Sequence, residues 1–232
     1  MKNKRLAIFI ETIGIVFLLL STIFFGTTIL PKIFKITQTA YLVITSFLAL
    51  SIVVICLWSV YNKKKQGSLS YFLQRFRLKK IRKTTVYRAF VIFLIATILS
   101  GFIKMLLEKY EIPFNSNEGF EGAKLVSKKE GYVYTVLLSF YVIFLGPLKE
   151  EIIFRGYLLP RQETALGKYA WILNGFAFNF AHLLVYDLAS LLLIAPFSFL
   201  IAYKVQKHKD ISIGLLAHFF MNTPFIIRLF IA

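Results

Sequence analysis

Long apolar runs separated by short charged clusters constrain this chain more than any other feature of its sequence. A run of about 18 or more apolar residues is typical of a helix that crosses a membrane, because about 20 residues span the hydrocarbon layer. Inside a bilayer only helices and closed barrels satisfy their backbone hydrogen bonds, and the runs lack the alternating pattern of a barrel. The sequence therefore predicts an all-α, polytopic membrane helical bundle.

Seven runs are long enough to be transmembrane helices, and eight spans are also compatible with the sequence. Their approximate bounds are 7–30, 40–61, 89–107, a span that begins near 132, 170–185, 188–205 and 211–231. We divide the chain into N-terminal membrane helices with a basic loop at 62–88, residues 1–131, and a membrane core, residues 132–232. We expect the two parts to form one structural unit.

The positive charge of the chain, formally +17, gathers between the runs. Segment 62–88 is rich in Lys and Arg and contains no Asp or Glu, which is typical of a cytoplasmic loop. This places the N-terminus inside and, for seven spans, the C-terminus outside, with the mixed-charge loop 108–130 outside. Segment 71–81 interleaves apolar and basic residues, which fits either an amphipathic helix on the inner leaflet or an ordinary loop. Because membrane topology explains the basic charge, we expect no nucleic-acid partner.

Ionisable residues inside the predicted spans call for an explanation, because each costs at least about 2.5–3.5 kcal/mol at the bilayer centre. Glu11 lies early in the first span, where a structural role is favoured. Glu150 and Glu151 follow Gly146-Pro147, a pair that we expect to break one helix and start another. Glu151 and Arg155 are four residues apart, so they share a face and can form an ion pair.

Two of the three histidines of the chain also lie in apolar runs, each near another polar residue. His182 lies on the same predicted helix face as Asn174 and Phe178, because the three positions recur every four residues. His218 shares a face with Asn222 for the same reason. A lone buried histidine is often only a hydrogen-bonded core residue, but two such placements favour a shared site.

Three motifs resemble the signature of the CAAX-protease and bacteriocin-processing family, also called Abi. They are Glu150-Glu151-x-x-x-Arg155, Phe178-x-x-x-His182 and His218-x-x-x-Asn222, in this order on separate predicted helices. The resemblance covers about 132–222, under half of the chain, and the region 132–232 is then the catalytic membrane core. It implies a helical intramembrane endopeptidase, a class whose eukaryotic members cleave prenylated CAAX proteins and whose bacterial members are linked to bacteriocin maturation, immunity and peptide signalling.

The resemblance also implies roles for the matching residues. Glu150 and His182 would activate water, and His218 and Asn222 would bind the developing oxyanion. Glu151 and Arg155 would form a supporting pair, and Phe178 belongs to the second motif. The residues leave a metal open, because Glu150, His182 and His218 could hold zinc as a metalloprotease site; a glutamate–histidine mechanism without a cofactor is the alternative.

The sequence thus predicts hydrolysis of a peptide bond in a membrane-associated peptide, such as a bacteriocin, leader or signalling peptide. Two alternatives remain: a non-catalytic bacteriocin immunity factor or membrane scaffold, and a small transporter, although no inverted repeat is evident. The expected location is the cell membrane as a multi-pass protein, and a composition rich in Ile, Phe and Lys favours a bacterial plasma membrane. Oligomeric state is left open.

The expected depths of Glu150, His182 and His218 within the bilayer differ, which argues against a shared site. At about 1.5 Å per residue, Glu150 lies near the cytoplasmic end of its predicted span, His218 roughly 10 Å deep and His182 nearer 20 Å. A shared site then requires tilted or broken helices, and the predicted break at Gly146-Pro147 is one such device.

Overall fold

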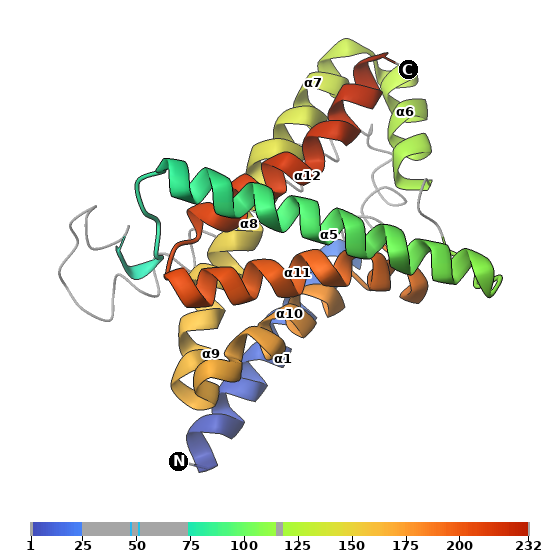
Figure 1. Cartoon of the computed structure of the whole chain (residues 1–232). Helices are drawn as coiled ribbons and strands as arrows, with labels where there is room; N and C mark the ends of the chain where they lie inside the picture. Colours follow the sequence, from blue (N-terminus) through green and yellow to red (C-terminus); the bar gives the residue numbers. More distant parts are fainter. Residues whose placement is uncertain (1, 25–46, 48–50, 52–73, 115–117, 232) are drawn as a thin grey trace.

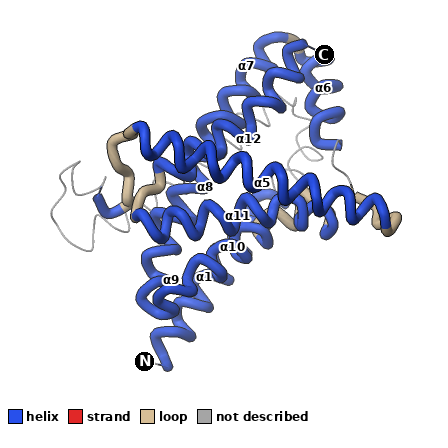
Figure 2. Tube along the Cα trace, in the orientation of Figure 1, coloured by secondary structure: helices blue, strands red, loops and turns tan. Residues whose placement is uncertain are grey.

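Every regular element is a helix in the part of the chain that the computed structural model describes, which is residues 2–24, 47, 51, 74–114 and 118–231 (Figures 1 and 2). The all-α prediction is confirmed for these residues. Among the described residues, three helices are long and apolar enough to cross a membrane: α5 (Lys83–Lys109), α11 (Leu188–His208) and α12 (Ser212–Ile231). Apart from residues 47 and 51, the predicted span 40–61 lies outside the described residues, and so does segment 62–73 of the basic loop. The count of seven spans therefore stays a prediction.

Helices α5 and α11 lie side by side through the middle of the molecule (Figure 1). Pro196 lies inside α11 and has no N–H to donate, which disturbs the backbone ladder of this helix. Close to it, the Ser100 hydroxyl of α5 donates a 2.6 Å hydrogen bond to the Leu193 carbonyl. Apolar side chains on α5 such as Ile98 and Phe102 stay exposed, as a lipid-facing surface requires.

One unbroken helical run extends from 132 to 166. It consists of α7 (Tyr132–Phe140), the π-helical segment η2 (Tyr141–Leu145), α8 (Gly146–Glu150), the π-helical segment η3 (Glu151–Leu158) and α9 (Leu159–Leu166). The predicted break at Gly146-Pro147 is therefore wrong, since Gly146 has helical dihedrals of −59° and −58°. A proline ring normally clashes with the carbonyl four residues back, and the wider π turn before Pro147 relieves that clash.

Helix α10 (Ala170–Phe180) is shorter than the predicted span 170–185. Its 11 residues rise about 16 Å, roughly half of the hydrocarbon thickness. The helix ends because a side chain competes for its backbone: Nδ1 of His182 lies 2.8 Å from the Phe178 carbonyl, and the His182 amide bonds the Asn179 carbonyl instead. Segment 181–186 then forms turns, so the C-terminal part of the predicted span is wrong.

Helix α6 (Glu118–Glu130) occupies most of the segment expected to be a loop on the outer side. No apolar run marks it in the sequence, but its Glu, Ala, Lys and Leu residues all have good intrinsic helix propensity. Its position therefore corrects the interpretation of 108–130 as a plain loop.

The first helix, α1 (Lys2–Phe24), packs on α9 and α10. The Arg5 guanidinium donates to the Ala165 carbonyl at 3.1 Å, and the Gln162 amide donates to the Thr12 hydroxyl at 3.2 Å. Further along, Leu19 joins an apolar cluster with Ile153. These contacts attach the N-terminal helix directly to the end of the long helical run.

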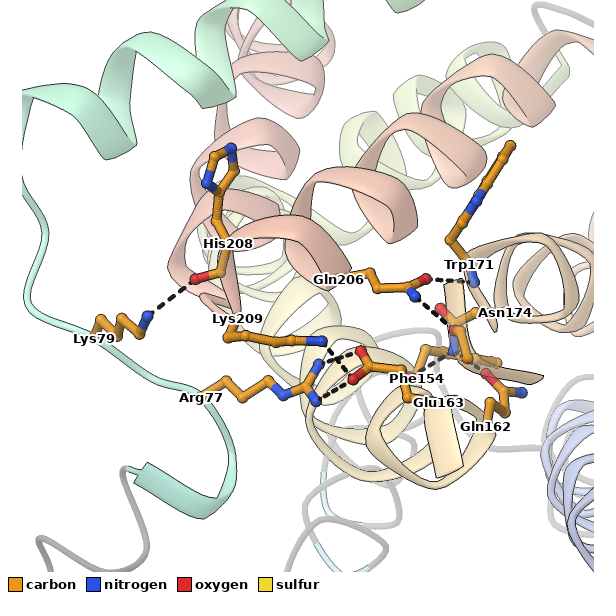
Figure 3. Close-up of polar contacts among 11 residues, drawn as sticks. Arg77, Lys79, Phe154, Gln162, Glu163, Trp171, Asn174, Gln206, His208 and Lys209 are labelled. Carbon is orange, nitrogen blue, oxygen red and sulfur yellow. Dashed lines mark hydrogen bonds and ion pairs between the residues drawn. The ribbon is translucent and has the colours of Figure 1, made fainter. Parts of the chain in front are cut away.

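Basic residues gather at the end of the molecule where α9, α11 and segment 74–82 meet (Figure 3). Arg77 makes a bidentate ion pair with Glu163, with hydrogen bonds of 2.7 and 2.9 Å. Lys209 pairs with the same carboxylate. Lys79 donates to the His208 carbonyl at 2.9 Å and accepts, through its own carbonyl, a 2.9 Å bond from the Ser212 hydroxyl. The cytoplasmic location of this end stays a prediction.

Candidate active site

Glu150, the last residue of α8, lies between two histidines from other segments of the chain. Its Oε1 is 3.8 Å from Nε2 of His182, and its Oε2 is 3.8 Å from Nε2 of His218. The three residues come from the long helical run, the turn after α10 and α12, so the fold brings together what the sequence spacing indicated. A separation of 3.8 Å is too long for a direct hydrogen bond and is of the size that one bridging water molecule can serve.

Because the helical run is continuous, Glu150 and His182 lie at similar depth. Because the run ends at Leu166 and not near Glu150, that carboxylate lies about 24 Å along the helix from its basic end. His182 lies about 18 Å from the start of α10, which begins just after the same end. The two side chains therefore reach similar depth, with no break in the helix.

The orientation of the His182 ring follows from its 2.8 Å contact with the Phe178 carbonyl. A carbonyl oxygen only accepts, so Nδ1 carries a proton, and in the neutral ring Nε2 is the basic nitrogen. That nitrogen is the one that faces Glu150. The ring also packs on Phe178 at 4.6 Å and stacks with Tyr186 at 6.1 Å between centroids, which holds it in place.

Glu151 and Arg155 form the ion pair that their spacing predicted. Their side chains have no solvent exposure, and Nη1 of Arg155 lies 3.2 Å from Oε1 of Glu151. The guanidinium also lies 4.3 Å from the centroid of the Phe178 ring and donates to the Ser198 carbonyl at 3.3 Å. Phe178 thus supports Arg155 of the first motif through its ring and His182 of the second motif through its carbonyl.

His218 contacts both glutamates. Its Nε2 lies 3.3 Å from Oε1 of Glu151 as well as 3.8 Å from Glu150. The ring is almost fully buried and meets Phe197 edge-on, at 4.9 Å between centroids. Among the described residues Nε2 has no hydrogen-bond partner with good geometry, and such a buried donor costs about 1–3 kcal/mol unless a ligand pairs with it.

Asn222 makes a structural contact, and its role as an oxyanion donor stays a prediction. Its Nδ2 donates a 2.8 Å hydrogen bond to the Val142 carbonyl, which belongs to η2. This bond ties α12 to the π segment that precedes α8 and Glu150. The second N–H of the same amide is chemically able to donate elsewhere.

A buried polar chain behind the site includes residues that the motifs did not indicate. Nδ2 of Asn174 bonds the Phe154 carbonyl at 2.7 Å and Oε1 of Gln162 at 2.9 Å, and Gln162 reaches Thr12 on α1 (Figure 3 shows its α9–α10 part). The shared face of Asn174 and His182 was visible in the sequence. The contact between Gln162 and Thr12 could not be seen in the sequence, because it joins positions 150 apart.

Glu11, expected to be structural, makes separate contacts with η3 and α9. Its Oε1 accepts from the Tyr157 hydroxyl at 3.0 Å and pairs with Arg161 at 3.1 Å. Arg161 in turn lies 3.8 Å from the centre of the Tyr157 ring. These bonds join α1 to the long helical run away from Glu150.

A metal ion is the other chemistry that the sequence left open for this site. No group of three or more His, Cys, Asp and Glu in residues 2–24, 47, 51, 74–114 and 118–231 has the arrangement that a metal ion needs. Glu150 directs its two oxygens to different histidines, and one of those histidines also faces Glu151. The role of Glu150, His182 and His218 as metal ligands stays a prediction.

A protein-family model matches part of the chain. Residues 132–224 match the family model described as type II CAAX prenyl endopeptidase Rce1-like. No curated protein and no solved structure matches the chain. The matched segment contains all three motifs and confirms the resemblance. The match is to an Rce1-like type II CAAX prenyl endopeptidase domain at residues 132–224, which is consistent with the CAAX-protease and bacteriocin-processing family.

Proposed function

We propose that this protein is an intramembrane endopeptidase that hydrolyses a peptide bond in a membrane-associated peptide, with Glu150 and His182 activating water. The observation that carries the proposal is the position of Glu150, whose two oxygens face two histidines across gaps of 3.8 Å. The family match to a protease supports the reaction class, and the apolar helices support a membrane location. A bacterial plasma membrane and a bundle of about seven spans belong to the same proposal.

In the first step, Glu150 accepts a proton from the water whose oxygen attacks the scissile carbonyl carbon. The basic Nε2 of His182 lies 3.8 Å from Oε1 of Glu150 and orients that water by accepting a hydrogen bond from it. General-base catalysis by a positioned carboxylate typically contributes about 10²–10⁴ in rate. The proton then passes to the leaving amine as the C–N bond breaks, which leaves a new carboxylic acid and a new amine.

The negative charge that develops on the carbonyl oxygen needs donors. Nε2 of His218 is the buried group best placed to donate, because it lies beside Glu150 and has no hydrogen-bond partner with good geometry among the described residues. The second N–H of Asn222 is the further donor that the motif suggests. We assign its observed bond to Val142 the task of holding η2, and with it Glu150, against α12.

The test is cleavage of a panel of membrane-anchored peptides, prenylated and unprenylated, by the purified full-length protein in liposomes. Glu150→Gln, His182→Ala and His218→Ala should each lower the rate by about 10² or more. His208→Ala and Glu108→Gln are matched controls, since both residues lie outside the site, and they should keep wild-type rates. Cleavage that survives all three site substitutions would exclude this site.

The substrate class is the remaining part of the proposal. A prenylated C-terminal peptide is the substrate that the name of the matched family describes, whereas a leader, bacteriocin or signalling peptide suits a bacterial protein. Comparison of the two halves of the panel decides between them, because only the first class requires the isoprenoid chain for cleavage.

A further inference from the structure

Gly214 lies in the first turns of α12, directly opposite the carboxylate of Glu151. A Cβ atom built on Gly214 would overlap Oε2 and Cδ of that carboxylate and would lie 3.0 Å from its Oε1. Glycine in a helix interior is otherwise unfavourable, because it has more conformational freedom to lose. A close approach between a backbone and a buried charged group is a physical reason to have it here.

The carboxylate cannot simply swing away from an added methyl group. Glu151 has no solvent exposure, and one of its oxygens, Oε1, pairs with both Arg155 at 3.2 Å and His218 at 3.3 Å. A displacement therefore weakens at least one of these two pairs inside a nonpolar environment, where an uncompensated charge is costly.

The same helix face carries both the glycine and one partner of the carboxylate. Gly214 and His218 are four residues apart on α12, so they lie one above the other. Glu151 thus rests along α12 with its carboxylate against Gly214 and one oxygen directed to the His218 ring. The contact links η3, which carries Glu151, to the helix that carries the proposed oxyanion donor.

We propose that Gly214 is a positioning residue: its missing side chain admits the Glu151 carboxylate against α12, so that this one group holds Arg155 and orients His218. The inference rests on the proposed function, because the orientation of His218 matters for the rate only if His218 assists peptide hydrolysis. It makes the arrangement of Arg155, Glu151 and His218 a unit that depends on a residue outside the three motifs.

The first test is the rate of peptide cleavage by Gly214→Ala in liposomes. We expect kcat to fall by about 10², the size of effect found when one oxyanion donor is lost, with KM changed by less than about threefold, because Gly214 acts through His218 and not through substrate binding. Gly101→Ala is the matched control: a Cβ there meets nothing within 4 Å, so its rate should equal that of the wild type.

A second variant separates positioning from general damage. In Gly214→Ala, the further change Glu151→Asp withdraws the carboxylate by one methylene and makes room for the new methyl group. The double variant should cleave at least about tenfold faster than Gly214→Ala alone, a non-additivity expected of residues in contact. If the two changes instead multiply their separate losses, the inference is overturned.

A measurement that needs no substrate accompanies the cleavage assay. Gly214→Ala should lower the Tm of the purified protein by at least about 2–4 °C, and this loss should vanish when Glu151 is already Ala, because the methyl group then fills vacated space. Gly101→Ala should have the same effect on Tm in both backgrounds. An equal Tm loss with and without the Glu151 carboxylate overturns the inference.

The two readouts distinguish failure of the inference from failure of the proposed function. If the wild type cleaves peptides and Gly214→Ala cleaves them equally fast, the inference is overturned while the proposed function stands. If the wild type and every variant cleave nothing but the Tm coupling is present, the proposed function fails and the packing of Glu151 against Gly214 is supported.

Discussion

Arg155 and Glu151 place opposite charges in a region without solvent exposure. Taking both charges out of water is expensive, so the pair adds little net stability as such, but removing one partner leaves the other charge uncompensated. The cation has further support from the Phe178 ring and the Ser198 carbonyl. Neither of these carries a negative charge, so the arginine depends on Glu151.

Glu151→Ala should therefore lower the free energy of unfolding by about 3–5 kcal/mol. The double variant Glu151→Ala with Arg155→Met should lose less than the single one, since it removes both charges. Thermal unfolding of the purified proteins measures both effects. Lys104→Ala is the control, because it breaks an exposed pair with Glu108 worth about 0.5 kcal/mol or less; an equal loss in the control and Glu151→Ala would contradict this account.

Residue spacing in the sequence was sufficient to single out the polar side chains of the site but not all of their contacts. The three motifs, four residues apart internally, indicated which faces carry Glu150, His182 and His218, and the structure places these faces together. The contact of Asn222 with Val142 could not be predicted, because it joins positions 80 apart through helix packing. Gly214 gives no local signal for the same reason.

At the scale of elements, the two π-helical segments determine the direction in which the Glu150 side chain points. They lie immediately before and after α8, so Glu150 sits on a short α-helical turn between two wider ones. Each extra residue in a turn rotates the later residues of the run relative to an ideal α-helix. The sequence suggested a helix break at Gly146-Pro147, because propensity records only the clash of proline and not the π turn that relieves it.

Pro147→Ala tests this role of the π turn. Alanine restores a backbone donor and permits a regular α-helical turn, so the variant should be at least as stable as the wild type. The same change favours a rotation of Glu150 away from the two histidines, and cleavage should fall by about tenfold or more. Tm and cleavage rate measured on one preparation check both. A rate equal to that of the wild type would show that η2 does not set the direction of Glu150.

At the scale of the whole molecule, helices outside the segment that matches the protease family also contact the elements that carry the site. Helix α1 lies outside residues 132–224 but bonds to α9 through Arg5, Glu11 and Thr12. Hydropathy predicted α1, α5, α11 and α12 as helices because their apolar runs are long. It led to wrong bounds for α10 and missed α6, where tertiary contacts and propensity outweigh apolar length.

The basic end of the molecule gives a pH-dependent prediction. Partial burial raises the pKa of Glu163, but hydrogen bonds and charge from Arg77 and Lys209 outweigh it and hold that pKa below its ordinary value of 4.5. A carboxyl group with a lowered folded-state pKa contributes stability above its unfolded-state pKa, and this contribution is lost as pH falls through the folded-state value.

Glu163→Gln should accordingly lower Tm at pH 7, and the difference from the wild type should shrink as pH falls below about 4.5. Glu108→Gln, at an exposed pair, serves as the control and should show little difference from the wild type at either pH. A Tm difference for Glu163→Gln that is constant between about pH 7 and about pH 3 would contradict the proposed charge interaction, which joins segment 74–82 to α9 and α11.

The central claim is that Glu150 activates a water molecule for peptide hydrolysis. Its most direct test is cleavage in ¹⁸O-labelled water of the panel peptide that the wild type cuts fastest, with mass spectrometry of the N-terminal product. The account predicts one ¹⁸O atom in the new carboxylate for the wild type and a rate at least about 10² lower for Glu150→Gln. Cleavage by Glu150→Gln at the wild-type rate, with the same label, would contradict it.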